Sequence, residues 1–281
     1  MIYTGVTGWG DHDTLYTKGV ASRDKLTEYA AHFPTVELDS SFYAVQPERN
    51  MRKWTDETPE GFRFVVKAYQ GMTGHERGEI PFDSKEEMFH AFNLSLTPMV
   101  ETGKLAMVLF QFPPWFDCTR ENVMYIRYCK EKMGDVPLAI EFRNQTWYKA
   151  KYFDKTISFL EQENWIHTVC DEPQAGDGSV PIVLQATNKE KTLVRLHGRN
   201  RAGWRKNGQK NWRKVRYLYR YNEHELRQWG DFTAELHKQS KDVYVLFNNN
   251  SGGDAADNAK QYLDLSGIQY DNLASRQLDL F

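Results

Sequence analysis

The sequence predicts one α/β domain, a closed (β/α)8 or TIM-type barrel in which eight parallel strands alternate with helices. The first observation is that short apolar runs alternate with amphipathic segments along all 281 residues, a pattern typical of βα units. The second is the length, because such a barrel typically needs about 250 residues. The third is that the apolar runs end in polar or ionisable residues, as expected where the carboxyl ends of the strands form the working face.

The predicted elements follow one another in regular order. The expected strands are Ile2–Thr7, Thr35–Asp39, Phe62–Ala68, Lys104–Gln111, Pro137–Phe142, Asn164–Asp171, Thr192–His197 and Asp242–Asn248. The expected helices lie near residues 23–33, 47–57, 84–102, 119–133, 152–163, 223–240 and 254–265. A doubly wound open sheet is the alternative fold, but its glycine-rich phosphate fingerprint is missing after the first strand.

Prolines mark some of the boundaries between these elements. Pro34 follows the first helix, and Pro113-Pro114 follow the fourth strand, because proline continues neither a helix nor a central strand. Residues 172–191 form an irregular stretch. We find no linker and no break in composition, so residues 1–265 are expected to form the barrel and residues 266–281 a C-terminal tail.

Composition and charge exclude several classes of protein. The net charge of −2 gives no overall attraction to polyanions. The three cysteines are too few and too scattered for a disulfide framework or a CxxC zinc site. The first residues lack the basic start and apolar run of a signal peptide, and no stretch reaches the 18 or so apolar residues of a membrane span. We therefore expect a soluble, cytoplasmic protein with no membrane partner.

The strand ends are expected to bring ionisable side chains to one mouth of the barrel. Side chains alternate with a period of two along a strand, so Glu141 shares a face with Arg143, and Arg195 shares one with His197. The residues expected to act in catalysis are Glu37, Asp39, Lys67, Glu141, Arg143, Asp171 and His197. The residues expected to bind the substrate are Trp9, Tyr43, Gln111, Arg195, Arg199, Trp204, Trp212, Asn248 and Asn249.

These residue types suit acid–base chemistry, because enclosed carboxylates and cations shift one another's pKa values. Glu141 or Asp39 is the candidate base, His197 is an acid or a base, and the cations form a clamp for an anion. A purely structural network of buried ion pairs is the alternative. No cofactor is predicted. A divalent metal at the mouth is a further alternative, since its carboxylates and His197 are suitable ligands, but the neighbouring cations oppose it.

Residues 195–221, the basic segment, begin at the end of the seventh strand and continue beyond it, and they contain ten Lys or Arg and no Asp or Glu. Trp204, Trp212 and three tyrosines are interleaved with these cations. Cations that meet phosphates and rings that stack on bases are typical of single-strand binding, and this part of a TIM barrel often binds phosphate. We expect a phosphate-containing ligand, with single-stranded nucleic acid among the candidates. The alternative is that these arginines pair with acidic residues elsewhere.

Several strand-end motifs resemble those of a known family. They are Gly5–Trp9, Val36–Tyr43, Phe64–Ala68, Leu109–Pro114, Glu141–Arg143 with Trp147, Val194–Arg199, and Tyr244–Asn250 with Gly252 and Ala255. On these motifs the chain resembles the YecE-like family, domain of unknown function 72, over about residues 2–265. The resemblance implies a TIM-type barrel and does not imply a reaction.

The last five residues, Gln277–Phe281, resemble the short motif by which bacterial replication and repair proteins bind the sliding clamp. An extended peptide of this kind would insert Leu278, Leu280 and Phe281 into an apolar cleft, while Gln277 makes polar contacts. The alternative is that the same apolar side chains pack against their own barrel. Clamp binding would raise the effective concentration of the protein on DNA.

The basic segment and the tail both indicate an association with DNA. The leading functional hypothesis is therefore a DNA-associated, hydrolase-like enzyme such as a nuclease or a nucleotide-repair enzyme. One alternative is a non-catalytic adaptor that binds nucleic acid and the clamp. Another is an enzyme that acts on a small phosphometabolite.

Overall fold

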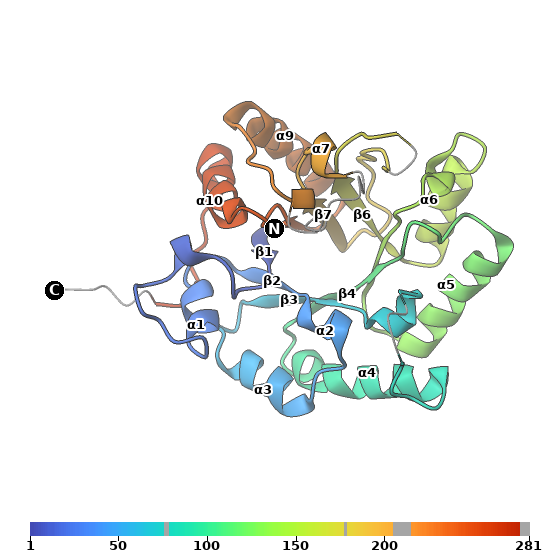
Figure 1. The fold of residues 1–281 in the computed structure, drawn as a ribbon, viewed down its shortest axis with the longest axis horizontal. Coiled ribbons are helices and arrows are strands. Elements are labelled where there is room, and N and C mark those ends of the chain that lie inside the picture. The colour runs from blue at the N-terminus through green and yellow to red at the C-terminus, as the bar shows by residue number, and fades with distance from the viewer. Residues whose placement is uncertain (76–78, 177–178, 205–214, 276–281) are drawn as a thin grey trace.

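The computed structural model describes residues 1–75, 79–176, 179–204 and 215–275. Eight parallel strands close into a barrel in chain order. Figure 1 shows helices arranged around the strands. The strands are β1 (Ile2–Thr7), β2 (Thr35–Leu38), β3 (Arg63–Lys67), β4 (Leu105–Gln111), β5 (Leu138–Glu141), β6 (Ile166–Asp171), β7 (Lys191–Leu196) and β8 (Asp242–Phe247). The predicted (β/α)8 barrel is confirmed.

The long helices begin and end close to the predicted positions. The described helices are α1 (Lys25–Tyr29), α2 (Ser40–Tyr43), α3 (Glu48–Asp56), α4 (Lys85–Glu101), α5 (Arg120–Met133), α6 (Phe153–Gln162), α7 (Arg201–Trp204), α9 (Glu223–Gln239) and α10 (Asp254–Ser266). Helix α1 is shorter than predicted, and α2 and α7 were not predicted. Helix α4 begins where Ser84 Oγ accepts a hydrogen bond from the Glu87 amide, and α9 begins at a capping box between Asn222 and Glu225. Both caps satisfy amides that the first turn of a helix leaves unpaired.

The core has two layers, one outside and one inside the barrel. The outer layer packs the outward side chains of the strands against the helices. The inner layer fills the lower barrel with Tyr3, Val65, Met107, Leu109, Leu193 and Tyr244 among others, and the rings of Tyr3 and Tyr244 stack at 4.7 Å. The barrel is therefore closed at its amino end, and polar side chains occupy the inward positions above this layer.

The segment after α10 lies against the barrel. The Tyr270 hydroxyl donates to the Ile2 carbonyl and accepts from the Thr4 amide, both at 2.9 Å, and the Ala274 amide donates to the Ala30 carbonyl at 3.0 Å. The clamp-like residues Gln277, Leu278, Leu280 and Phe281 lie outside the described residues.

Among the described residues, no helix is both long enough and apolar enough to cross a membrane.

Candidate functional site

Arg195 is the centre of a buried charge network at the carboxyl end of the barrel. It lies on an inward position of β7, two residues beyond Leu193 of the inner core. Its guanidinium donates to both oxygens of Glu37 at 2.6 and 2.8 Å and to Glu141 at 2.6 Å. The Gln111 amide oxygen accepts a further bond at 3.3 Å. Inward residues of β2, β4, β5 and β7 therefore meet, as the period-two pattern predicts.

Arg143 forms the second half of this network, two residues beyond Glu141. Its Nε lies 2.5 Å from Glu141 Oε1, and its Nη1 donates to Glu172 at 2.6 Å. The other Glu172 oxygen accepts from the Val180 amide at 2.6 Å. Both arginines are almost fully buried. Their charges persist because carboxylates compensate them on several sides.

His197 is held as a neutral ring. Arg143 Nη2 lies 3.0 Å from His197 Nε2 and can only donate, so Nε2 accepts. The other ring nitrogen, Nδ1, lies 2.9 Å from Nδ2 of the Asn248 amide. Burial and the charge of Arg143 lower the pKa of His197 well below its ordinary value. Both ring nitrogens are thus engaged, which argues against His197 as the acid or base.

The three buried glutamates differ in the direction of their pKa shifts. Burial alone would raise the pKa of Glu141, but the charges of Arg143 and Arg195 hold it well below its ordinary value. Burial raises the pKa of Glu37 and of Glu172, and Arg195 and Arg143 offset only part of this effect. Glu141 is therefore an anion that positions two arginines.

Asp39 and Lys67 form an ion pair that faces a cavity. Lys67 Nζ donates to Asp39 Oδ1 at 2.9 Å and lies 4.5 Å from the centroid of the Phe42 ring. The Asp39 side chain is 34% exposed, unlike the glutamates behind it. Burial would raise the pKa of Asp39, but the charge and hydrogen bond of Lys67 lower it. Asp39 is therefore an ionised carboxylate that a ligand can reach.

The cavity has a volume of about 360 Å³ and lies over the charge network. Its lining includes the expected residues Asp39, Tyr43, Lys67, Gln111, Arg143, Arg195 and Asn248. It also includes Phe42, His75, Pro114, Trp115, Arg216 and Tyr217, which the sequence analysis did not assign to the site. Most of these added residues come from loops after the strands, where no periodic pattern indicates which way a side chain points.

Asp171 and Arg199 do not join this network, which corrects the predicted site. Inward positions of β6 are Ile166, Thr168 and Cys170, so Asp171 points outward to α9. There it accepts from Trp229 Nε1 at 2.8 Å and from Arg199 Nε at 2.9 Å. Arg199 also donates to Glu225 at 3.1 Å. The inward carboxylate at this strand end is Glu172. The period-two rule holds, but β6 is buried on both faces, so its sequence does not indicate which face is inward.

Three other predicted residues also have structural contacts. The Trp9 ring packs edge-on against Trp54 of α3 at 5.3 Å. Asn249 is fully buried and donates to the Tyr219 carbonyl and to Asn258 of α10, at 2.8 and 2.9 Å. Trp204 is buried, and its ring lies 4.0 Å from the Arg216 guanidinium and 5.8 Å from that of Arg143. Trp9 and Asn249 do not line the cavity, and Trp212 lies outside the described residues.

The described arginines of the basic segment mostly face carboxylates. Arg195 and Arg199 are paired as above, and Arg220 lies 2.9 Å from Asp254 and 3.7 Å from Asp257. Five of the ten cations lie outside the described residues, namely Arg205, Lys206, Lys210, Arg213 and Lys214. Among the described cations of this segment, Arg195 and Arg216 line the cavity. Arg199 and Arg220 therefore pair with acidic residues, which is the alternative to phosphate binding that the sequence left open.

A metal does not suit the charges of this site. Ligand atoms of Glu141, Cys170 and His197 lie within 4.8 Å of one another. However, Arg143 donates to His197 Nε2, and both Arg143 and Arg195 contact Glu141. A cation would have to displace both arginines, and burial raises the pKa of the Cys170 thiol. These residues favour an ion-pair network over a metal centre.

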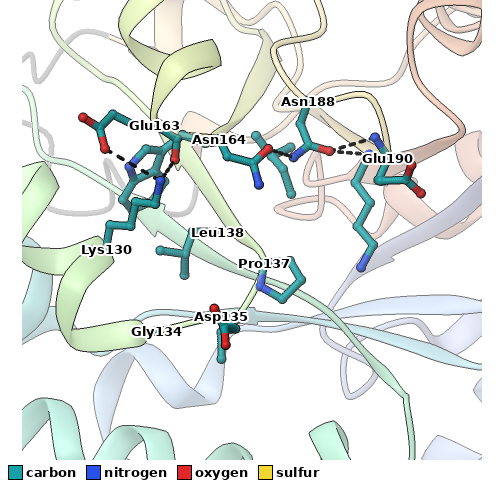
Figure 2. Close-up of a pocket in the computed structure, with 13 residues that line it drawn as sticks. Lys130, Gly134, Asp135, Pro137, Leu138, Glu163, Asn164, Asn188 and Glu190 are labelled. Carbon is teal, nitrogen blue, oxygen red and sulfur yellow. Dashed lines mark hydrogen bonds and ion pairs between the residues drawn. The ribbon is translucent and has the colours of Figure 1, made fainter.

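A second cavity, of about 400 Å³, lies at the opposite end of the barrel beside the start of β5, β6 and β7 (Figure 2). Its labelled polar groups are largely paired with one another. Lys130 contacts Glu163, and Asn188 donates to Asn164 at 2.7 Å and accepts from the Glu190 amide at 2.9 Å. Residues at this end of TIM barrels usually serve stability, whereas active sites lie at the carboxyl ends of the strands.

Comparisons with known proteins agree with the fold. The UPF0759 protein YunF of Bacillus subtilis (strain 168) is 66% identical over 282 residues, covering 100% of both chains. The UPF0759 protein YecE of Escherichia coli (strain K12) is 23% identical over 158 residues, which is 56% of this chain and 54% of that protein.

Two solved structures extend the comparison. The crystal structure of a DUF72 family protein from Enterococcus faecalis V583 has a TM-score of 0.93 and 39% identity, covering 99% of this chain and 100% of that one. A DUF72 family protein from Thermotoga maritima MSB8 has a TM-score of 0.80 and 29% identity, covering 94% of this chain and 98% of that one. The family model described as "Protein of unknown function DUF72" matches residues 3–279, so the chain belongs to the DUF72 family.

Proposed function

We propose that the carboxyl-end cavity binds a small phosphate-bearing molecule and hydrolyses its phosphate ester, with Asp39 as the general base. The observation that carries this proposal is that one reachable, ionised carboxylate, Asp39, lies in a cavity whose lining also includes the cations Lys67, Arg143, Arg195 and Arg216. Cations of this kind bind phosphate oxygens with charge-assisted hydrogen bonds. The volume of about 360 Å³ suits a small molecule.

The proposed reaction assigns a role to each group. Asp39 takes a proton from a water molecule, whose oxygen attacks phosphorus while the phosphorus–oxygen bond of the ester breaks. The proton then passes to the leaving oxygen, so that the products are an alcohol and inorganic phosphate. Lys67, Arg195 and Arg216 stabilise the charge on the phosphate oxygens. Glu37, Glu141 and Glu172 hold Arg195 and Arg143 in place and do not exchange protons with the substrate.

Phosphate release from a panel of nucleotides, sugar phosphates and short single-stranded DNA tests this proposal. Asp39→Asn keeps the shape of the side chain and should lower kcat by about 10²- to 10⁴-fold, the usual contribution of a general base. Lys67→Met should also lose activity, whereas Lys151→Met, which neutralises an exposed lysine beside Tyr152, should retain it. Full activity of Asp39→Asn, or no phosphate release from any member of the panel, would contradict the proposal.

The tail supports a second candidate, in which the protein works on DNA while bound to the sliding clamp. Its support is the five-residue motif Gln277–Phe281 and the density of cations in residues 195–221. The Leu280→Ala, Phe281→Ala double variant should lose binding to purified clamp, measured by fluorescence polarisation. Affinity for single-stranded DNA should fall steeply as salt rises. Binding without turnover would favour the non-catalytic adaptor, and unchanged clamp binding by the double variant would exclude the motif.

A further inference from the structure

The rim of the carboxyl-end cavity carries two large exposed aromatic side chains. Trp115 is 66% exposed and Tyr43 is 64% exposed, and both line the cavity. Large apolar side chains exposed at a cavity are a common sign of a binding surface. Neither ring is used by the proposed phosphate chemistry.

Ring contacts join these two residues into one surface, the aromatic wall, formed by Tyr43, Phe42, His75 and Trp115. The centroids of Tyr43 and Phe42 are 5.2 Å apart, those of Phe42 and His75 are 5.2 Å apart, and those of His75 and Trp115 are 5.9 Å apart. Thr73 Oγ1 lies 2.9 Å from His75 Nδ1 and fixes the imidazole in the middle of the wall. The wall extends from α2 to the loop after β4.

Trp115 is exposed although the backbone around it is firmly held. The Phe116 amide donates to the Pro113 carbonyl at 3.0 Å, and Asn144 Nδ2 donates to the Pro114 carbonyl at 2.6 Å. The next ring, Phe116, is buried and stacks on Phe112 at 4.0 Å. Two prolines and these bonds restrict the loop, so the backbone that carries the indole is preorganised and a ligand need not spend free energy to order it.

The opposite arc of the rim supplies a second ring beside a cation. In a closed barrel of eight strands, β7 lies across from β3. Tyr217, in the segment that follows β7, lines the cavity, and Arg216 lies 5.4 Å from the centroid of its ring. The cavity therefore offers flat apolar surfaces at its rim and cations in its depth.

We infer that the ligand is a nucleotide, with its base stacked on the aromatic wall and its phosphate among Lys67, Arg195 and Arg216. The inference rests on the proposed function for the position of the phosphate, and it adds the requirement for a planar ring. Lys67 links the two parts, because the same ammonium lies over Phe42 and contacts Asp39. Stacking of a base on an aromatic side chain tolerates any base, since every base has a π-face.

Isothermal titration calorimetry with two non-hydrolysable probes tests this inference on the full chain. The probes are adenosine 5′-methylenephosphonate and the matching ribose 5-methylenephosphonate without a base. The adenosine probe should bind on the order of ten- to a hundredfold more tightly, as expected for one stacked base. Trp115→Ala should abolish this difference without changing the affinity for the ribose probe, and Trp115→Phe should restore most of it. Met124→Ala, at an exposed apolar residue of α5, should change neither affinity.

The outcomes separate the two proposals. Equal affinity for both probes, or an equal loss of both in Trp115→Ala, would overturn the nucleotide inference and leave phosphate binding intact. Failure of both probes to bind would overturn phosphate binding and the inference with it. If Trp115→Ala changed only the mass of the particle in multi-angle light scattering, a second copy of the chain would cover the ring, and the inference would be wrong.

Discussion

At the scale of single residues, the site depends on Arg195. This guanidinium compensates two fully buried carboxylates, Glu37 and Glu141. Arg195→Met would leave both without their shared cation. Breaking a buried ion pair on one side typically costs about 3–5 kcal/mol of unfolding free energy. Urea unfolding at neutral pH measures this loss, and the exposed control Arg227→Met, which removes a pair with Glu223, should lose less than about 1 kcal/mol.

The pH dependence of the Arg195→Met variant has a defined sign. Without Arg195, the pKa of Glu37 in the folded chain rises further above its unfolded value, and the pKa of Glu141 rises from its lowered position. The folded variant then binds protons more tightly than the unfolded chain, so its stability is lost as pH rises. The deficit relative to the wild type should therefore be larger at pH 8 than at pH 5. A deficit that grows as the pH falls would contradict this account of the network.

His197 provides a second prediction at the residue scale. Burial and the charge of Arg143 lower its pKa, so the ring should stay neutral from pH 5 to pH 8. Nitrogen-15 spectra of histidine-labelled protein, with His197→Gln for the assignment, measure this directly. Because the folded pKa lies below the unfolded one, this residue lowers stability as pH falls through the ordinary histidine range. A ring that takes up a proton near its ordinary pKa would show that Arg143 is not its neighbour in solution.

At the scale of elements, long periodic segments are predictable and short connecting ones are not. The sequence predicts α4 and α5 nearly to the residue, because each has an N-cap, Ser84 or Thr119, before an amphipathic run. The short helices α2 and α7 are missed, since four residues are too few to show a helical period. Trp115 and Tyr217 lie outside the strands and the long helices. Because their segments show no periodic pattern either, both residues are absent from the predicted site.

The site is predicted best where a strand has one polar and one apolar face. The inward positions of Glu141 and Arg195 are predicted because their neighbours Ile140 and Leu196 are apolar. Strand β6 is buried on both faces, so nothing in its sequence separates the outward Asp171 from the inward Glu172. Asp171 pairs with Arg199, and Glu172 pairs with Arg143. Both contacts depend on how distant segments pack, which the local sequence does not show.

The N-cap of α9 connects this helix to the segment that follows β7. Asn222 Oδ1 accepts from the Glu225 amide, and Glu225 in turn accepts from Arg199 and from Tyr219. Asn222→Ala should cost about 1 kcal/mol of unfolding free energy, the usual value for a lost N-cap. It should also weaken ligand binding, because residues 215–221 lead directly into this cap.

The matched control for this prediction is Ser84→Ala, which removes the N-cap of α4. It should cost a similar amount in urea unfolding and leave ligand affinity unchanged. If both variants weakened binding equally, the cap of α9 would have no special connection to the cavity.

At the scale of the whole molecule, the two ends of the barrel differ in how they use polar groups. At the amino end, the polar side chains around the cavity of Figure 2 largely bind one another. At the carboxyl end, Arg216 and the Asp39–Lys67 ion pair line a cavity above a layer of compensated charge. Inside the barrel, the stacked rings of Tyr3 and Tyr244 belong to the inner core, which lies between the two ends of the barrel.

The most direct test of this account is a crystal structure of the protein soaked in tungstate, grown without phosphate or sulfate. Tungstate mimics the charge and tetrahedral shape of phosphate, and its anomalous scattering locates it without ambiguity. The account predicts an anomalous peak in the carboxyl-end cavity within hydrogen-bond distance of Lys67 and Arg195 or Arg216. A cavity without tungstate, with peaks confined to the amino-end cavity or to the outer surface, would contradict it.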